Sequence, residues 1–195
     1  MTPPRGSHPV SAPFRHSAVN ESITGTYTVA IASVNPTPDV ELVNVNGVID
    51  TTLYFQGGLP RPIGINALNT NNKICVAVPD KQHAQTYSID VYNTNGEIIV
   101  ALPEEFQGII KVSSVAGRLV LSSALLSQSK LIDRSEKSAT YRVVPSSQWD
   151  FDDKVDSLQA DSCILANVNG SITVIYYGED LQDLQTNGRS CCLLM

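Results

Sequence analysis

The feature that most constrains this chain is a turn of the Asn-Gly type that recurs between short apolar runs. Five stretches of β-like sequence share it, at residues 40–50, 63–78, 88–102, 109–122 and 163–177. The second residues of their turns are 25, 24, 21 and 53 positions apart. This period predicts stacked units, each too small to bury its own apolar face, with the last gap spanning about two periods. The turns are Asn46-Gly47, Asn71-Asn72, Asn95-Gly96, Ala116-Gly117 and Asn169-Gly170.

The chemistry of these turns predicts an all-β fold. A sharp turn between strands needs backbone with φ > 0, which glycine reaches without a Cβ clash and which asparagine tolerates best among the other residues. Two architectures fit. One is a β-solenoid similar to a right-handed β-helix, in which the turns form a column of corners; the other is an antiparallel β-sandwich of hairpins. The near-constant period favours the solenoid.

Composition divides the 195 residues into three parts and excludes some functions. Hydrophobic residues make up 42% and charged residues 16%, as in a globular domain. We predict a disordered tail over residues 1–22, a β-repeat domain over 23–178 and a flexible leader over 179–195. The formal net charge of −6 argues against binding of nucleic acid. The first residues have no apolar stretch typical of a secretory signal, so we expect a reducing, cytoplasmic compartment.

The last four residues carry the one function-bearing motif. Cys192 is followed by two leucines and Met195, which is the Cys-aliphatic-aliphatic-X pattern of prenylation, with a final residue that favours farnesyl. One prenyl chain anchors a protein only marginally, and the acidic leader offers no basic cluster as a second signal. Cys191 is then the candidate for S-palmitoylation. The motif predicts a peripheral protein on the cytosolic face of a membrane.

No pattern in the sequence points to catalysis or to a cofactor. Phosphate loops, Gly-x-Ser-x-Gly and His-Glu-x-x-His patterns do not occur in it, so we assign no catalytic, cofactor-binding or metal-ligating residue. The acidic run Asp150, Asp152 and Asp153 is interpreted as a solvated turn. Tyr92 and other aromatic residues could line a carbohydrate groove, but packing in the core or at the edge of a unit explains them better.

One segment of the sequence resembles the motif of a known family. It runs from Asn95-Gly96 through an apolar strand to Pro103, Phe106 and Gly108. It is similar to the core motif of DUF7330, a domain of unknown function found in many mushroom-forming fungi, and the likeness extends over about residues 22–178. The resemblance implies an adhesin-like β-repeat domain with right-handed β-helix character. It implies no catalytic residues, because none is established for the family.

Three hypotheses for function follow. The first is a non-enzymatic interaction or scaffold domain, held at a membrane by its lipid and binding an unknown protein partner. The second is an adhesin-like or carbohydrate-binding module. The third is a polysaccharide-acting enzyme on a β-helix, which would need carboxylates from different units in one groove. Self-association is also open, because a stack with uncovered ends exposes unpaired strand edges.

Overall fold

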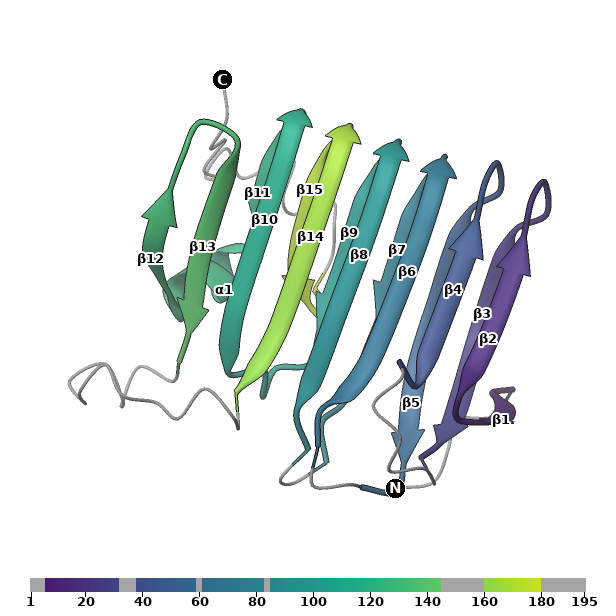
Figure 1. Cartoon of the computed structure of the whole chain (residues 1–195). Helices are drawn as coiled ribbons and strands as arrows, with labels where there is room; N and C mark the ends of the chain where they lie inside the picture. Colours follow the sequence, from purple (N-terminus) through teal and green to yellow (C-terminus); the bar gives the residue numbers. More distant parts are fainter. Residues whose placement is uncertain (1–5, 32–37, 59–60, 83–84, 145–159, 180–195) are drawn as a thin grey trace.

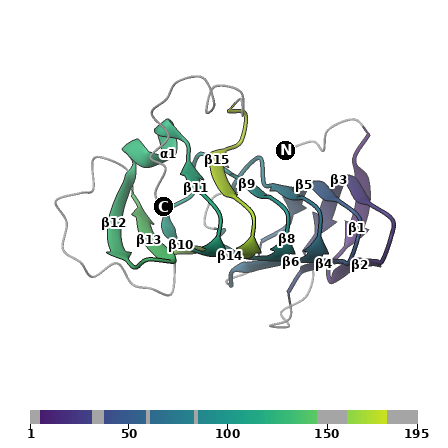
Figure 2. The same ribbon diagram turned by 90° about the horizontal axis from the view of Figure 1, so that it is seen from above.

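The computed structural model describes residues 6–31, 38–58, 61–82, 85–144 and 160–179, which form fifteen strands and one short helix. The strands lie in two sheets that face each other (Figures 1 and 2). Sheet A has the order β1 (His8–Ser11), β3 (Ile23–Ala30), β5 (Ile49–Gln56), β7 (Ile74–Ala77), β9 (Ile98–Leu102), β15 (Ile172–Tyr176), β11 (Leu119–Leu121). Sheet B has the order β12 (Ser129–Arg134), β13 (Ser138–Val143), β10 (Gly108–Ala116), β14 (Asp161–Asn169), β8 (Tyr87–Asn95), β6 (Ile63–Asn71), β4 (Val40–Asn44), β2 (Phe14–Ala18). The predicted all-β class is confirmed.

Each recurring turn joins a strand of sheet B to the next strand of sheet A. We call such a pair a layer, and the layers are β2/β3, β4/β5, β6/β7, β8/β9, β14/β15 and β10/β11. Neighbouring layers pair through parallel ladders in both sheets. Among the described strands, antiparallel pairing is confined to β13, which lies between β10 and β12. The Asn-Gly turns therefore connect strands of different sheets and do not close hairpins.

The core lies between the sheets and consists of aliphatic columns. Strands of sheet B alternate buried and partly exposed positions, as expected when one face is covered. The parallel register places Val40, Ile65, Ile89, Cys163 and Ile110 side by side, and all five are buried. A slip of one residue would turn such a column out to solvent, so burial fixes the register.

The fifth repeat unit does not follow the fourth in space. Layer β14/β15 lies between β8/β9 and β10/β11, pairing with β8 on one side and with β10 on the other. The 53-residue gap therefore holds no further layer among its described residues. It contains β12 and β13, and the short helix α1 (Ser123–Ser127). Ser122 caps this helix by accepting a hydrogen bond from the Leu125 N–H at 3.2 Å.

The predicted disorder of residues 1–22 is wrong for residues 6–22. β1 pairs with β3, and β2 pairs with β4, so the tail supplies the sheet B strand of the first layer and an edge strand of sheet A. Phe14 packs against Tyr27 with ring centroids 4.8 Å apart. The prolines and polar residues of this stretch suggested disorder, but the open edges of β3 and β4 provide backbone partners that composition does not reveal.

Candidate functional site

The predicted turn residues meet in one column at the upper ends of the sheet B strands (Figure 1). Asn72, Gly96 and Gly170 have φ of 75°, 123° and 155°, as the turn chemistry predicts. Gly47 and Gly117 lie outside the left-handed region, so the prediction of positive φ is wrong at these two positions.

Close approach of the neighbouring layer explains glycine at Gly47 and Gly117. A Cβ atom at Gly47 would overlap the carbonyl oxygen of Glu21, and one at Gly117 would overlap that of Gly170. The turns stack so tightly that a side chain at this position would push two layers apart. The requirement comes from packing between layers, which the local turn pattern does not show.

The asparagine at the first position of four of the turns takes part in an exposed ladder along the stack. The side-chain amide of Asn46 donates to Asn20 at 2.8 Å, and that of Asn71 donates to Asn46 at 2.8 Å. Asn95 donates to Asn71, and Asn169 donates to Asn95, both at 2.9 Å. The ladder continues without a break from β8/β9 to β14/β15, which we call the inserted layer because it lies between β8/β9 and β10/β11.

A second, buried row of asparagines was missed by sequence reasoning. These residues stand two positions before the outer ones, and each donates its amide to a backbone carbonyl of the neighbouring layer. The signal that could have found them is the longer motif Asn-x-Asn, followed by Gly or, after Asn71, by Asn. The bonds are Asn44 to Glu21 at 2.8 Å, Asn69 to Gly47 at 2.9 Å, Asn93 to Asn72 at 2.7 Å and Asn167 to Gly96 at 2.7 Å.

We expect Asn93→Ala to lower the free energy of unfolding by about 0.5–1.5 kcal/mol, because it removes the hydrogen bond from the buried Asn93 amide to the Asn72 carbonyl of the neighbouring layer. Asn95→Ala is the matched control, since it removes two exposed ladder bonds and should cost less than Asn93→Ala. Urea unfolding followed by circular dichroism measures both. Equal losses for the two variants would contradict the assignment of the buried row as the stronger link.

At the ends of the sheet B strands that lie away from the Asn-Gly turns, buried carboxylates link neighbouring layers. The side chain of Asp161 is 0% exposed and accepts three hydrogen bonds, from Lys81 Nζ at 2.6 Å and from the backbone N–H groups of Tyr87 and Gln107 at 2.8 Å. These partners belong to the segments on both sides of the inserted layer. Asp39 pairs with Arg61 through two bonds of 2.8 Å in the same part of the sheet. Both carboxylates are engaged in structure.

The outer face of sheet B carries an exposed apolar surface, which we call the apolar face. A shallow groove of about 490 Å³ runs over it from β4 to β10. Its rim includes the residues that stand between the two asparagines of each Asn-x-Asn turn. These residues point outward and are β-branched, namely Val45, Thr70, Thr94 and Val168. Four large side chains in this groove are between 36% and 57% exposed, namely Val45, Tyr92, Val168 and Val115.

A polar groove of about 430 Å³ adjoins the apolar face toward the start of the strands. Asp90, Asn66, Ser88 and Arg61 are among its lining residues. Burial raises the pKa of the Asp90 carboxyl above its ordinary value. Asp90 is the single carboxylate in this lining, so the groove lacks the pair of carboxylates that glycoside hydrolysis uses.

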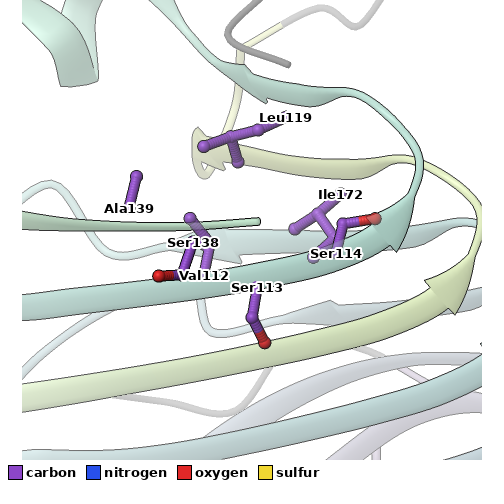
Figure 3. A pocket seen from close by; sticks show the side chains of 7 residues that line it. All are labelled: Val112, Ser113, Ser114, Leu119, Ser138, Ala139 and Ile172. Carbon is purple, nitrogen blue, oxygen red and sulfur yellow. The ribbon is translucent and has the colours of Figure 1, made fainter. Parts of the chain in front are cut away.

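A third cavity lies inside the molecule, between the sheets near β10 and β11 (Figure 3). Its volume is about 10 Å³, which holds no more than one water molecule. Val112, Leu119 and Ile172 line it together with Ala139 and three serines. It is a packing gap and has no room for a ligand.

The described cysteines are structural. Cys163 is fully buried, and burial raises the pKa of its thiol far above the ordinary value. Burial, with a contribution from Asp50, raises the pKa of Cys75 to about 11. Both thiols are protonated at neutral pH and are poor nucleophiles. The predicted lipidation residues, Cys191 and Cys192, lie outside the described residues, as does the acidic run at residues 150–153.

The described residues contain neither a metal-binding cluster nor a membrane-spanning helix. In the described ranges, His, Cys, Asp and Glu side chains form no group of three or more that could hold a metal ion. None of the helical structure seen there is long and apolar enough to cross a membrane.

The fold and its surfaces define a class, namely an all-β repeat domain of two sheets with a grooved outer face. Comparison with protein families gives the particular family. The model described as "Domain of unknown function (DUF7330)" matches residues 33–179, and the chain belongs to this family. The match begins after the first layer, somewhat later than the resemblance in the sequence suggested. No curated protein and no solved structure gives a significant match.

Proposed function

We propose that the domain is a non-enzymatic β-solenoid that binds a protein partner across the apolar face. The observation that carries this proposal is the row of exposed aliphatic and aromatic side chains on sheet B. Contiguous apolar surface of this kind is costly in water and marks interaction sites on soluble domains. The solenoid assignment rests on the parallel ladders and on the stacked turns, which extend through six layers.

The composition of the apolar face favours a protein over a carbohydrate. Tyr92 is the one aromatic side chain in the lining of its groove, and the others are mainly Val, Leu, Thr and Asn. Carbohydrate sites rely on aromatic platforms beside several polar groups, whereas aliphatic residues suit the apolar centre of a protein interface. The single carboxylate of the polar groove argues against the enzymatic alternative.

Site-specific photocrosslinking in the native host tests this function. A photoreactive phenylalanine analogue at position 92 should give a crosslinked product of defined mass, because this position is 40% exposed at the centre of the apolar face. The same analogue at position 24, which is exposed on the outer side of sheet A, is the control.

The products distinguish the alternatives. A protein crosslinked at position 92 and absent at position 24 supports the proposal. A product of twice the chain mass would identify a second copy as the partner. A lack of any product specific to position 92, with a folded protein, would refute binding at this face.

We also propose that the domain is held at the cytosolic face of a membrane through a prenyl group on Cys192 and a palmitoyl group on Cys191. Support comes from the sequence motif, since these residues lie outside the described part of the chain. The two proposals are compatible, because the lipid attaches beyond β15 of sheet A and the apolar face belongs to sheet B.

A further inference from the structure

Asp90 is a carboxylate of the polar groove that has no cation beside it. It lies on β8 between Ile89 and Val91, which are both fully buried in the core, so its side chain points out of sheet B. None of the salt bridges formed by the described residues includes Asp90. Burial disfavours the charged form of its carboxyl, and a cation from another molecule would offset this cost.

A second oxygen atom without a hydrogen-bond donor belongs to the neighbouring residue. Asn66 on β6 stands in register with Asp90, and both line the polar groove. The Oδ1 atoms of both residues are shielded from solvent, and neither accepts a hydrogen bond from the described residues. Shielded acceptors without a donor are rare in proteins because they cost free energy. The two atoms therefore indicate a ligand that donates hydrogen bonds.

The cation in the lining of the polar groove is already engaged. The guanidinium of Arg61 donates two hydrogen bonds of 2.8 Å to Asp39, whose side chain is only 3% exposed. This pair is neutral as a whole, so it does not repel a second cation that approaches Asp90. A metal ion suits the site poorly, because hard cations take six or more oxygen ligands and Asp90 is the single carboxylate of the lining.

Tyr92 narrows the choice to a flat cation. It stands two positions after Asp90 on the same face of β8, about 6–7 Å along the strand, and is 40% exposed. Its neighbour on β14 is Ala166, and both residues line the groove of the apolar face. A guanidinium group can stack on an aromatic ring and bind a carboxylate through its fork of N–H groups at the same time.

We infer that the protein partner proposed for the apolar face places an arginine side chain against Asp90 and Tyr92. The inference rests on the proposed function and adds the chemistry of the partner to it. The guanidinium donates hydrogen bonds to the Asp90 carboxylate and to Asn66 Oδ1, and its plane lies along the Tyr92 ring. Apolar residues on either side of this arginine would cover the rest of the apolar face. The net charge of −6 favours the approach of such a cationic segment.

Titration of the full-length protein with N-acetylarginine amide tests the inference before any partner is identified. NMR should show saturable shifts of the Asp90 carboxyl carbon and of the Tyr92 ring protons. The control compound is N-acetylcitrulline amide, in which an uncharged urea group of similar shape replaces the guanidinium. It should bind at least about tenfold more weakly, because the charge-assisted hydrogen bonds are lost. Equal binding of the two compounds, or no saturable shift at Asp90, would overturn the inference.

Matched variants locate the site. Asp90→Asn keeps the shape of the side chain and should weaken binding of N-acetylarginine amide at least about tenfold. Tyr92→Leu should weaken it about threefold through the loss of stacking. Glu41→Gln is the control, because Glu41 stands in the same outward row on β4 but is paired with Arg15 at 3.1 Å. Equal weakening by Glu41→Gln and Asp90→Asn would show a general response to charge and would contradict a site at Asp90.

Failure of this inference can be told apart from failure of the proposed function. A protein crosslinked at position 92, without binding of N-acetylarginine amide, would support the interface and overturn the arginine site. Binding of the compound at Asp90, with no protein crosslinked at position 92, would support a guanidinium site but overturn a protein partner as the source of the guanidinium.

Discussion

Cys192→Ser should move the protein almost completely from the membrane fraction to the soluble fraction of its native host. Serine cannot form the thioether by which a prenyl group is attached, so the variant loses the first of the two proposed lipid signals. Palmitoylation of Cys191 would be lost with it, if the enzyme acts on the protein only at the membrane. Fractionation and immunoblotting measure the distribution, and intact mass shows the farnesyl addition and the loss of residues 193–195 in the wild type.

Two controls separate this effect from a defect in folding. Cys191→Ser should give an intermediate distribution, because one prenyl chain alone holds a protein weakly and reversibly. Extension of the chain by two residues beyond Met195 should act like Cys192→Ser, because the motif must end at a free carboxylate. Equal distribution of Cys192→Ser and wild type would remove the proposal of a lipid anchor and leave the proposed protein interface untouched.

Asp161→Ala should lower the free energy of unfolding by about 3–5 kcal/mol. The substitution leaves the Lys81 ammonium, whose side chain is only 14% exposed, without its carboxylate. It also leaves the backbone N–H groups of Tyr87 and Gln107 without an acceptor. A loss of this size is a large part of the stability of an ordinary domain.

Urea unfolding of Asp161→Ala and of the double variant with Lys81→Met identifies the cause. If the unpaired ammonium dominates the loss, Lys81→Met should recover part of it, because the double variant no longer buries a charge. If the two N–H groups dominate, the double variant should be as unstable as the single one. A loss below about 1 kcal/mol for Asp161→Ala would contradict the assignment of Asp161 as a central link.

Local features of the fold could be predicted from the sequence, because the turns are encoded by residues adjacent in the chain. Asn95-Gly96 and its relatives marked the corners and the all-β class, and the period indicated stacking. The position of β14/β15 could not be predicted. Every layer presents nearly the same parallel backbone hydrogen bonds to its neighbours. Which layers pair is therefore decided by contacts between segments that are distant in the sequence, such as the bond from Gln107 N–H to Asp161.

The candidate site was harder to predict than the fold. Tyr92 was noted as an aromatic residue, but its aliphatic neighbours Val45 and Val168 appear in the sequence only as the variable position of a turn. Whether such a residue points outward depends on the face that its strand turns to the core. The row of buried asparagines was not predicted for a related reason. Asn93 and its equivalents donate hydrogen bonds to a neighbouring layer, which the local sequence of their own turn does not show.

The order of the layers changes what a shortened chain would lose. In a stack that follows the sequence, a stop codon near the end removes a terminal layer and leaves the others in contact. Here β14/β15, encoded last, separates β8/β9 from β10/β11. A stop codon after residue 160 would therefore remove the middle of the molecule, and a ribosome must release nearly the whole chain before the two halves of the stack can be joined.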